Sequence, residues 1–402
     1  MFEIKGIYET AKCYAINIEE NAIEQIRAMC DQPFTKDANV VIMPDAHAGI
    51  GCTIGTTMKV VDAVVPNIVG VDIGCGMYTI DLGKGNISLP ALDDACHTVP
   101  SGKHVWEGRR ERFDLQELRC YRHLRDAKRI ERSIGTLGGG NHFIEIDVAD
   151  DGTQYLVIHS GSRNLGKQVA EYYQALAVDL HSGKEEYFVA RDALIAKYKE
   201  AGRRSEIQTA LKDLATRFEA KEPDAPAELC WLYGSYLDDY LHDIAVCQRF
   251  AKQNRESIAR EVLQLTGLDG HDAFHTVHNY IDTNEMVLRK GAIAAHEDEI
   301  VLIPLNMRDG SVLARGKGNA EWNNSAPHGA GRLMSRLVAK ETLSMDDYRA
   351  QMEGIYTTSV SERTLDEAPD AYKAADDIMG VISDAVDVQD VLRPIYNFKA
   401  QN

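Results

Sequence analysis

The first third of the chain alternates short apolar runs with glycine-rich turns. The runs VVIMPD, TTMKVVDAVV and MYTIDLG are rich in apolar and β-branched residues, which predicts strands. From about 165 to 265 the apolar spacing changes to three and four, as in EYYQALAVDL, ALIAKYKEAG and YLHDIAVCQRFAKQNRESIAREVLQL, which predicts helices. After Gly270 strand-like runs return (EMVLRKGAI, EIVLIPL, SVLAR), and helices are expected after Gly331.

Candidate chemical motifs lie on both sides of the helical stretch, and no repeat or Pro/Ser-rich linker divides the sequence. This arrangement favours a single composite α+β domain over residues 1–402, with a mainly helical insertion at about 165–265, over independent domains. We expect mixed or antiparallel sheets around a central metal cleft, which the motifs below would form.

Composition narrows the class of protein. The chain has 402 residues, of which 44% are hydrophobic and 26% charged, as in ordinary globular proteins. The start MFEIKGIYET lacks an apolar core, so we expect no signal peptide, and no apolar run is long enough to predict a membrane span. The eight cysteines form no CxxC pair, which predicts buried thiols in a reducing compartment, most simply the cytoplasm.

The charge pattern limits the partners. A net charge of −18 is unfavourable for broad adhesion to nucleic acid or to anionic membranes. Residues 109–132 nevertheless hold nine Lys or Arg against five Asp or Glu. This basic strip is either a solvated helix with ion pairs along it or a surface that faces phosphate groups.

The stretch GVDIGCGM, residues 70–77, places a carboxylate and a thiol in one glycine-rich loop. Glycine lets the backbone turn tightly and approach a ligand closely. Asp72 and a Cys75 thiolate would repel each other unless a cation lies between them. Both residues are therefore candidate metal ligands.

Two histidines lie on a predicted hairpin. In NHFIEIDVADDGTQYLVIHS, residues 141–160, alternating apolar positions flank the turn signal ADDGT. A turn centred between Asp150 and Asp151 places His142 directly opposite His159, with Cβ atoms about 5 Å apart. Each ring could then hold one of two metal ions about 4 Å apart, whereas a slip of one residue would move one ring to the other face.

A fifth candidate ligand is His278, in VHNYI, while the nearby His271 and His275 are expected to lie outside the site. A lone histidine is more often a hydrogen-bonded structural residue, and that alternative stays open for each ring. On affinity alone such ligands prefer Zn²⁺ or Cu²⁺ to Mn²⁺, so composition does not name the metal. The full set, in which the thiolate would touch both ions, is Asp72, Cys75, His142, His159 and His278.

A second group of residues suits phosphate chemistry. His328 is followed by Gly-Ala-Gly and a predicted helix, RLMSRLVAKETL, whose first amide N–H groups could bind phosphate. With a reference pKa of about 6.5, a histidine is mainly neutral at pH 7 and can attack phosphorus without first losing a proton. A capping or structural role for His328 is the alternative. Several basic residues lie in glycine-containing turns, which suggests that the site binds more than one phosphate group: Arg163, Arg289, Lys290, Arg315 and Lys317.

Taken together, these motifs resemble the RtcB family of RNA ligases, which join RNA ends using GTP. The matching stretches run in the family's order from Asp45 to Arg336: PDAHAG, VGVDIGCGM, GTLGGGNHFIEI, VIHSGSRNLG, HNY, RKGA and HGAGRLMSR. A weaker match continues through EAPDAYKAADDIM to the C-terminus. The resemblance therefore covers most of the chain.

The resemblance implies a reaction. His328 would attack the α-phosphate of GTP, giving a guanylyl-histidine and pyrophosphate. The guanylyl group would pass to an RNA 3′-phosphate, formed where needed by opening a 2′,3′-cyclic phosphate, and an RNA 5′-hydroxyl would then form the phosphodiester and release GMP. The five metal-site residues would hold two Mn²⁺ ions, with Cys75 bridging them. Arg163 and Lys290 would bind the RNA phosphate, and Asp45 would orient or deprotonate the 5′-hydroxyl.

The resemblance also implies a nucleotide site and partners. Glu145 would recognise guanine, since a carboxylate can accept two N–H bonds from that base. Besides the RNA ends, an archease-like activator is a further partner that the resemblance suggests. The implied nucleotide contacts are Asn141, His142, Phe143, Ile144, Glu145, His278, Asn279, Pro304, Leu305, Asn306, Met307, Ser311, His328, Gly329, Ala330, Gly331, Tyr372 and Lys399.

The sequence departs from the family pattern at two places. Leu305 and Asn306 stand where many members have Gly-Ser, and Ala326 and Pro327 stand where others have Cys-Ser before the histidine. These changes affect the expected fit around the guanine and the nucleotide preference.

Two other functions would use the same residues. In a two-metal phosphoesterase acting on cyclic or terminal phosphates, His328 would only contact phosphate, and hydrolysis would need no GTP. A non-catalytic metalloprotein would bind RNA ends tightly for a partner, without turnover under any nucleotide.

Overall fold

The computed structural model describes residues 1–15, 17–49, 51–218 and 221–400. An antiparallel seven-stranded sheet, in the order β10-β6-β8-β7-β17-β15-β14, forms its centre. Its strands are β6 (Gly76–Gly83), β7 (Phe143–Val148), β8 (Gln154–Ser160), β10 (Ala273–Val277), β14 (Ile300–Asn306), β15 (Gly310–Gly316) and β17 (Val386–Lys399).

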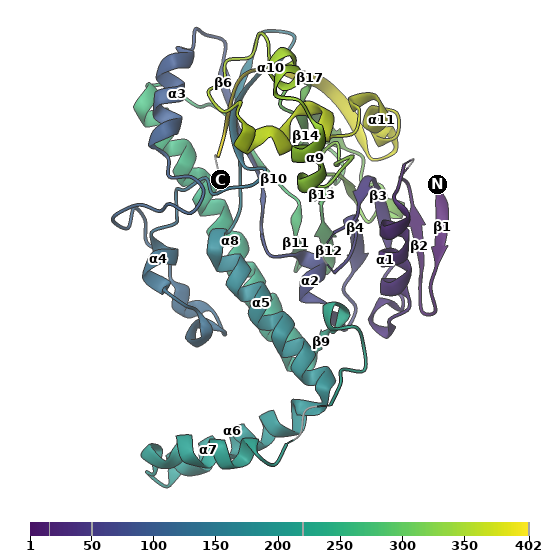
Figure 1. The fold of residues 1–402 in the computed structure, drawn as a ribbon, viewed down its shortest axis with the longest axis vertical. Coiled ribbons are helices and arrows are strands. Elements are labelled where there is room, and N and C mark those ends of the chain that lie inside the picture. The colour runs from purple at the N-terminus through teal and green to yellow at the C-terminus, as the bar shows by residue number, and fades with distance from the viewer. Residues whose placement is uncertain (16, 50, 219–220, 401–402) are drawn as a thin grey trace.

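A six-stranded sheet, in the order β1-β2-β3-β4-β12-β11, lies beside it (Figure 1). It is mixed, because β2 and β3 run parallel while the other neighbours are antiparallel. Its strands are β1 (Phe2–Lys5), β2 (Thr10–Cys13), β3 (Val41–His47), β4 (Ile54–Lys59), β11 (Asn279–Asp282) and β12 (Val287–Lys290). Short pairs join β5 (Ala63–Val64) to β9 (Leu232–Tyr233) and β13 (Ala292–Ala294) to β16 (Ser325–Pro327).

The chain passes from one large sheet to the other at His278, since β10 ends one residue before it and β11 begins one residue after it. Cys75 directly precedes β6, His142 directly precedes β7, and His159 is the last residue but one of β8. The predicted metal ligands therefore gather where strand ends of the two sheets meet. The predicted α+β class, with mixed and antiparallel sheets around this cleft, is confirmed.

Helices α5 (Arg163–Asp179) and α8 (Gly234–Thr266) lie side by side behind this junction (Figure 1). The 33-residue α8 is buried along much of its length because it contributes to two hydrophobic cores. Its first half packs with the core of the six-stranded sheet through Ile244 and Phe250. Its second half packs under the seven-stranded sheet through Ile258 and Val262.

The region at about 165–265 holds α5, α8 and two helices between them, α6 (Glu185–Glu200) and α7 (Ile207–Ala215), which project away from the sheets (Figure 1). That this region is an insertion stays a prediction.

Among the described residues, none of the helices combines the length and the apolar character needed to cross a membrane. The other α-helices are α1 (Glu20–Cys30), α2 (Pro66–Val69), α3 (Leu89–Thr98), α4 (Ala127–Glu131), α9 (Arg336–Thr342), α10 (Met345–Gln351) and α11 (Ala375–Met379).

The basic strip at 109–132 is not one helix. The predicted solvated helix with ion pairs along it is therefore wrong. It is broken into short turns, with α4 as its only α-helix, and Asp126 in the left-handed region (φ 50°) precedes that helix. Buried Asp243 on α8 accepts the backbone N–H groups of Arg119 and Cys120 at 2.7 and 3.0 Å. These bonds to α8 replace the hydrogen bonds that a continuous helix would make.

Candidate active site

The side chains of the five predicted metal ligands lie in a row, each next to another. The Sγ atom of Cys75 lies 3.3 Å from Nε2 of both His142 and His159. Asp72 continues the chain at one end, with Oδ2 3.0 Å from His142 Nε2. His278 continues it at the other, with Nε2 3.4 Å from His159 Nε2. The five donors thus form one continuous row, Asp72, His142, Cys75, His159 and His278, with the sulfur in its middle.

The spacing of the donor atoms fits metal ions. Bond lengths of 2.0 to 2.3 Å and tetrahedral angles would place neighbouring donors about 3.5 Å apart, close to the separations seen here. The potential ligand atoms of Cys75, His142 and His159 all lie within 4.8 Å of one another. Sulfur, imidazole and carboxylate together suit transition metals.

The electrostatics of the buried cluster are compatible with a bound cation. Burial and the neighbouring Asp72 raise the pKa of the Cys75 thiol well above its ordinary value, so the thiolate forms only with help. Burial lowers the pKa of His159 and His278 well below the ordinary value, which keeps both rings in the neutral form that binds metals. Burial alone would raise the pKa of Asp72, but its hydrogen bond to His142 and the charges around it hold that pKa below its usual range.

The hairpin register differs by one residue from the prediction. His159 pairs with Phe143, because the connection Ala149–Thr153 has an odd number of residues and is centred on Asp151. His142 nevertheless meets His159, with ring centroids 5.1 Å apart. Its position before the first residue of β7 frees it from strand alternation, so the wrong register did not separate the two rings.

Two glycines admit charged side chains to the cluster. A Cβ atom on Gly161 would lie 2.1 Å from Oδ1 of Asp72, and one on Gly138 would lie 1.4 Å from the guanidinium of Arg163. Arg163 itself adopts a left-handed backbone (φ 56°) at the start of α5. Gly138 and Gly161 therefore leave the space that these two side chains occupy.

His328 faces the same cleft, with its ring centroid 5.0 Å from that of His278. Its Nδ1 lies 2.6 Å from Oδ2 of Asp45, a fully buried carboxylate that also accepts the His328 backbone N–H. Nδ1–H therefore donates to Asp45, which leaves Nε2 with a free lone pair. Asp45 is buried behind the histidine and does not line the cavity in front of it.

The predicted helix after His328 begins later than expected, which is a correction. Residues 329–335 are irregular, and α9 begins at Arg336 with Ser335 as its N-cap. Gly331 has a left-handed backbone (φ 74°), and a Cβ atom there would lie 2.2 Å from the Asp45 carbonyl oxygen. The segment follows β3 closely at this point and cannot yet coil into a helix.

A cavity of about 330 Å³ lies in front of His328 and the five candidate metal ligands, which we call the metal cluster. Of the expected nucleotide contacts it is lined by Asn141, Phe143, Glu145, His278, Asn279, Pro304, Leu305, Asn306, Met307, His328, Gly329, Ala330, Gly331, Tyr372 and Lys399. Lys290, predicted to bind RNA phosphate, also lines it and donates to the Asn67 carbonyl at 3.0 Å. Ile144 lies instead in the core on the other face of β7, and Ser311 and His142 are not part of this lining.

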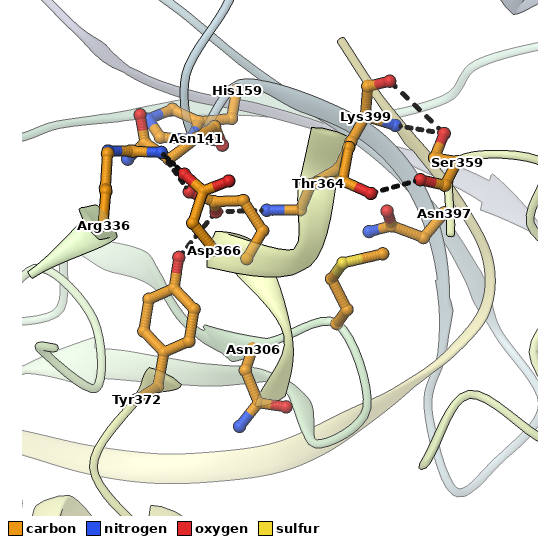
Figure 2. A network of polar contacts seen from close by, with 12 residues as sticks. Asn141, His159, Asn306, Arg336, Ser359, Thr364, Asp366, Tyr372, Asn397 and Lys399 are labelled. Carbon is orange, nitrogen blue, oxygen red and sulfur yellow. Dashed lines mark hydrogen bonds and ion pairs between the residues drawn. The ribbon is translucent and has the colours of Figure 1, made fainter. Parts of the chain in front are cut away.

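One end of this cavity carries a network of buried charges (Figure 2). Glu367, 2% exposed, accepts from Lys399 Nζ at 2.8 Å, from Arg336 Nη1 at 2.5 Å and from the Tyr372 hydroxyl at 2.6 Å. Arg332 Nη1 also donates to it, at 3.2 Å. The network fixes four side chains that line the cavity, those of Arg332, Arg336, Tyr372 and Lys399.

Glu145 lies at the same end, on β7. Asn397 of β17 stands directly opposite and donates to its carboxylate. Burial raises the pKa of Glu145 and of Asp147 two residues on, and repulsion from Glu145 raises that of Asp147 further. A proton on the more enclosed Asp147 would leave Glu145 ionised toward the cavity.

A second cavity of about 530 Å³ is lined by two of the candidate metal ligands, Asp72 and His142. Its basic side chains come from three segments of the chain, and we call it the basic cleft: Lys103, His104, Arg125, Arg129, Arg163 and Lys167. Asp72 lines both cavities. Part of the basic strip therefore faces a cleft, while Arg110 and Arg119 form exposed ion pairs with α8.

Comparison with known proteins agrees with this geometry. A family model described as tRNA-splicing ligase RtcB matches residues 25–119 and 110–400. The RNA-splicing ligase RtcB of Escherichia coli K12 is 30% identical over 420 residues, which cover 94% of each chain. The tRNA-splicing ligase RtcB of Archaeoglobus fulgidus is 28% identical, over 91% of this chain and 88% of its own. The chain belongs to the RtcB family.

Several residues of this RtcB-family site were not predicted. His47, Arg332 and Arg336 line the first cavity, and each lies inside a motif that the resemblance already contained, PDAHAG or HGAGRLMSR. Burial lowers the pKa of His47 to about 4, so its ring is neutral at pH 7. Asn397 had no such signal, because only the pairing of β17 with β7 brings it to Glu145.

The departures from the RtcB pattern fall in different places. Leu305 and Asn306 line the first cavity. Ala326 and Pro327 pair with β13 in the short strand before His328.

His271 lies near Gly83, and His275 stacks on Tyr78, with ring centroids 4.3 Å apart, so neither belongs to the metal cluster.

Proposed function

We propose that this RtcB-family chain is a GTP- and Mn²⁺-dependent RNA ligase that joins 3′-phosphate or 2′,3′-cyclic phosphate ends to 5′-hydroxyl ends. The observation that carries the proposal is the placement of His328. Its Nδ1–H is held by buried Asp45, and its ring stands beside His278 in the cavity that the metal cluster lines. A neutral imidazole oriented by a carboxylate is a prepared nucleophile.

The reaction would begin with attack of His328 Nε2 on the α-phosphorus of GTP. The P–N bond forms as the bond to the pyrophosphate oxygen breaks, and Asp45 stabilises the charge that develops on the ring. An oxygen of the RNA 3′-phosphate then displaces the histidine, and the RNA 5′-hydroxyl displaces GMP. Water first opens a cyclic end to the 3′-phosphate. Because Asp45 is fully buried, we assign it to orienting His328 in place of the 5′-hydroxyl.

Asp72, Cys75 and His142 would hold one Mn²⁺, and Cys75, His159 and His278 would hold the other. The ions would neutralise phosphate charge and align the attacking and leaving groups. Glu145, beside Lys399 and Tyr372, would bind the guanine. These assignments are supported by the row of donor contacts through Cys75 and by the residues that line the first cavity.

We place the phosphates of the RNA in the basic cleft. Arg163 would meet the terminal phosphate, since its guanidinium lies between Ser160 and His142 at the inner end of the cleft. Arg125, Arg129 and Lys167 would follow the backbone outward. A local concentration of cations lets a chain of net charge −18 bind a polyanion at one place.

Incubation with Mn²⁺ and α-labelled GTP should attach the label covalently to the protein. His328→Ala should remove it completely, and His271→Ala, outside the site, should keep it. Label that persists in His328→Ala would contradict the role of His328. Hydrolysis of cyclic phosphates without GTP would indicate a phosphoesterase, and tight end binding without turnover would indicate a binding protein.

The double variant Arg125→Ala/Lys167→Ala should raise KM for RNA about tenfold and leave guanylylation by GTP unchanged. At about 0.7 per phosphate contact on a single strand, the slope of log affinity against log salt should become shallower by about 1.4. Filter binding of a 3′-phosphate RNA between 50 and 200 mM salt measures this. Arg119→Ala, which lies in the same strip but outside the cleft, is the control, and an equal loss there would reject the placement.

A cytoplasmic location and an archease-like activator stay predictions. Both concern the protein's surroundings, and neither changes the chemistry proposed for the site.

A further inference from the structure

Two consecutive polar side chains, Asn254 and Arg255, are buried in the middle of α8, with exposures of 0% and 1%. Burying an amide and a guanidinium is costly unless their polar atoms are hydrogen-bonded. Here the partners are backbone groups of loops that carry the metal ligands. The position on α8 falls between its two hydrophobic cores, directly behind the metal cluster.

Arg255 joins two of these loops. Its Nη1 donates to the Gly74 carbonyl at 2.7 Å and to the Ser160 carbonyl at 2.9 Å. Gly74 immediately precedes Cys75, and Ser160 immediately follows His159. One guanidinium nitrogen therefore fixes the separation between the segments that carry the bridging thiol and one imidazole.

Asn254 adds the third loop. Its Oδ1 accepts the N–H groups of Gly135 and Thr136 at 2.8 and 3.0 Å. Its Nδ2 donates to the Thr136 carbonyl, the Ser160 hydroxyl and the Gly161 carbonyl at 3.0 to 3.2 Å. Both hydrogen-bonding groups of the amide are fully used, so the side chain holds one orientation.

The third loop leads directly to His142. Ser160 Oγ donates to the Leu137 carbonyl at 2.9 Å, and His142 Nδ1 lies 2.9 Å from the same oxygen. Arg163 Nη1, which can only donate, lies equally close to Nδ1, at 2.9 Å. With a metal bound at Nε2, Nδ1 would carry a proton and donate to the Leu137 oxygen. The orientation of His142 thus depends, through Ser160 and Leu137, on α8.

The helix approaches the Cys75 loop closely. A Cβ atom on Gly74, whose φ is 74°, would lie 3.0 Å from Gln248 Cα and 3.0 Å from Ala251 Cβ. Burial lowers the pKa of Arg255 to about 10, so its guanidinium stays charged at neutral pH. A rigid helix with a fixed positive charge therefore backs the loop that carries Asp72 and Cys75.

We propose that Asn254 and Arg255 are positioning residues that hold the donor atoms of Cys75, His142 and His159 at metal-binding separations. This inference rests on the proposed two-metal site. On this proposal, α8 supports the loops that carry the metal ligands. Loss of partners of this kind typically weakens metal binding about 10- to 100-fold.

The test uses Co²⁺ with the full chain and no nucleotide, and follows the absorption of the cobalt–thiolate bond. Arg255→Lys keeps the charge but cannot reproduce the planar guanidinium, and Asn254→Asp removes the amide donors. Each should raise the Co²⁺ dissociation constant about 10- to 100-fold and alter the ligand-field bands. Lys252→Ala, on the exposed side of α8, should match the wild type.

Unchanged affinity and spectrum in folded Arg255→Lys and Asn254→Asp would overturn the proposal. If either fails to fold, Ser160→Ala decides, because it removes the hydroxyl that links Asn254 to Leu137 and that otherwise makes only two longer contacts, with Arg163 at 3.4 Å and the Thr136 carbonyl at 3.5 Å. It should weaken Co²⁺ binding, and wild-type affinity there would reject the link. A wild-type protein with no thiolate band would instead refute the proposed metal site itself.

Discussion

Cys75→Ala should bind no Mn²⁺, whereas Asp72→Ala and His278→Ala should each retain one ion of two. The reason is the shared sulfur, which lies 3.3 Å from the Nε2 atoms of both His142 and His159, while Asp72 and His278 each extend only one end of the cluster. Ligation should be undetectable in Cys75→Ala. Equilibrium dialysis with Mn²⁺, quantified by electron paramagnetic resonance, measures the stoichiometry.

The fold itself should survive this change. Burial keeps the Cys75 thiol protonated when no cation is present, so its removal should cost about 1 kcal/mol of folding free energy. Cys96→Ala is the matched control, since Cys96 is equally buried but lies in the core of the seven-stranded sheet. Two ions bound to Cys75→Ala would refute the bridging role.

Glu367→Ala should lower the free energy of unfolding by about 3 to 5 kcal/mol, because it leaves the buried Lys399 and the largely buried Arg332 without their counter-charge. Lys399, Arg332 and Arg336 all contact this carboxylate. Urea denaturation at pH 7 measures the effect. Glu362→Ala, an exposed glutamate in the same short helix (Glu362–Glu367), should change the unfolding free energy little.

The same carboxylate predicts a pH dependence. Burial alone would raise its pKa, but the three cations hold the pKa of Glu367 well below its usual range. Its contribution to stability is therefore complete above the unfolded value of about 4.3 and is lost as the pH falls below it. The stability difference between wild type and Glu367→Gln should shrink from pH 7 toward pH 3. A difference that stays constant over this range would contradict the assignment.

The sequence predicted that the five candidate metal ligands lie together, because short local segments hold most of them. That they bind metal stays a prediction. The Asp72–Cys75 loop and the hairpin of His142 and His159 each bring ligands close within one short segment. The one-residue error in register came from the odd-numbered turn, and it was harmless because His142 precedes its strand. His278 could be proposed as a ligand, but its place between two sheets could not be read from its neighbours in sequence.

What the sequence missed depends on long-range pairing. Asn397 meets Glu145 only because the C-terminal strand β17 joins the central sheet. Asn254 and Arg255 occupy an ordinary helical pattern, and nothing local distinguishes them from solvent-facing residues. The late start of α9 has a similar origin, since close contact between Gly331 and β3 overrides the helical spacing of RLMSRLVAKETL.

The place of His278 has a mechanical consequence. His159 belongs to the seven-stranded sheet, while the chain enters the six-stranded sheet directly after His278. An ion held by both the His159 and His278 rings would connect the two sheets, so that relative motion of the sheets would stretch its coordination bonds. In that case metal binding would reduce the relative motion of the two sheets, and removal of the metal would increase that motion.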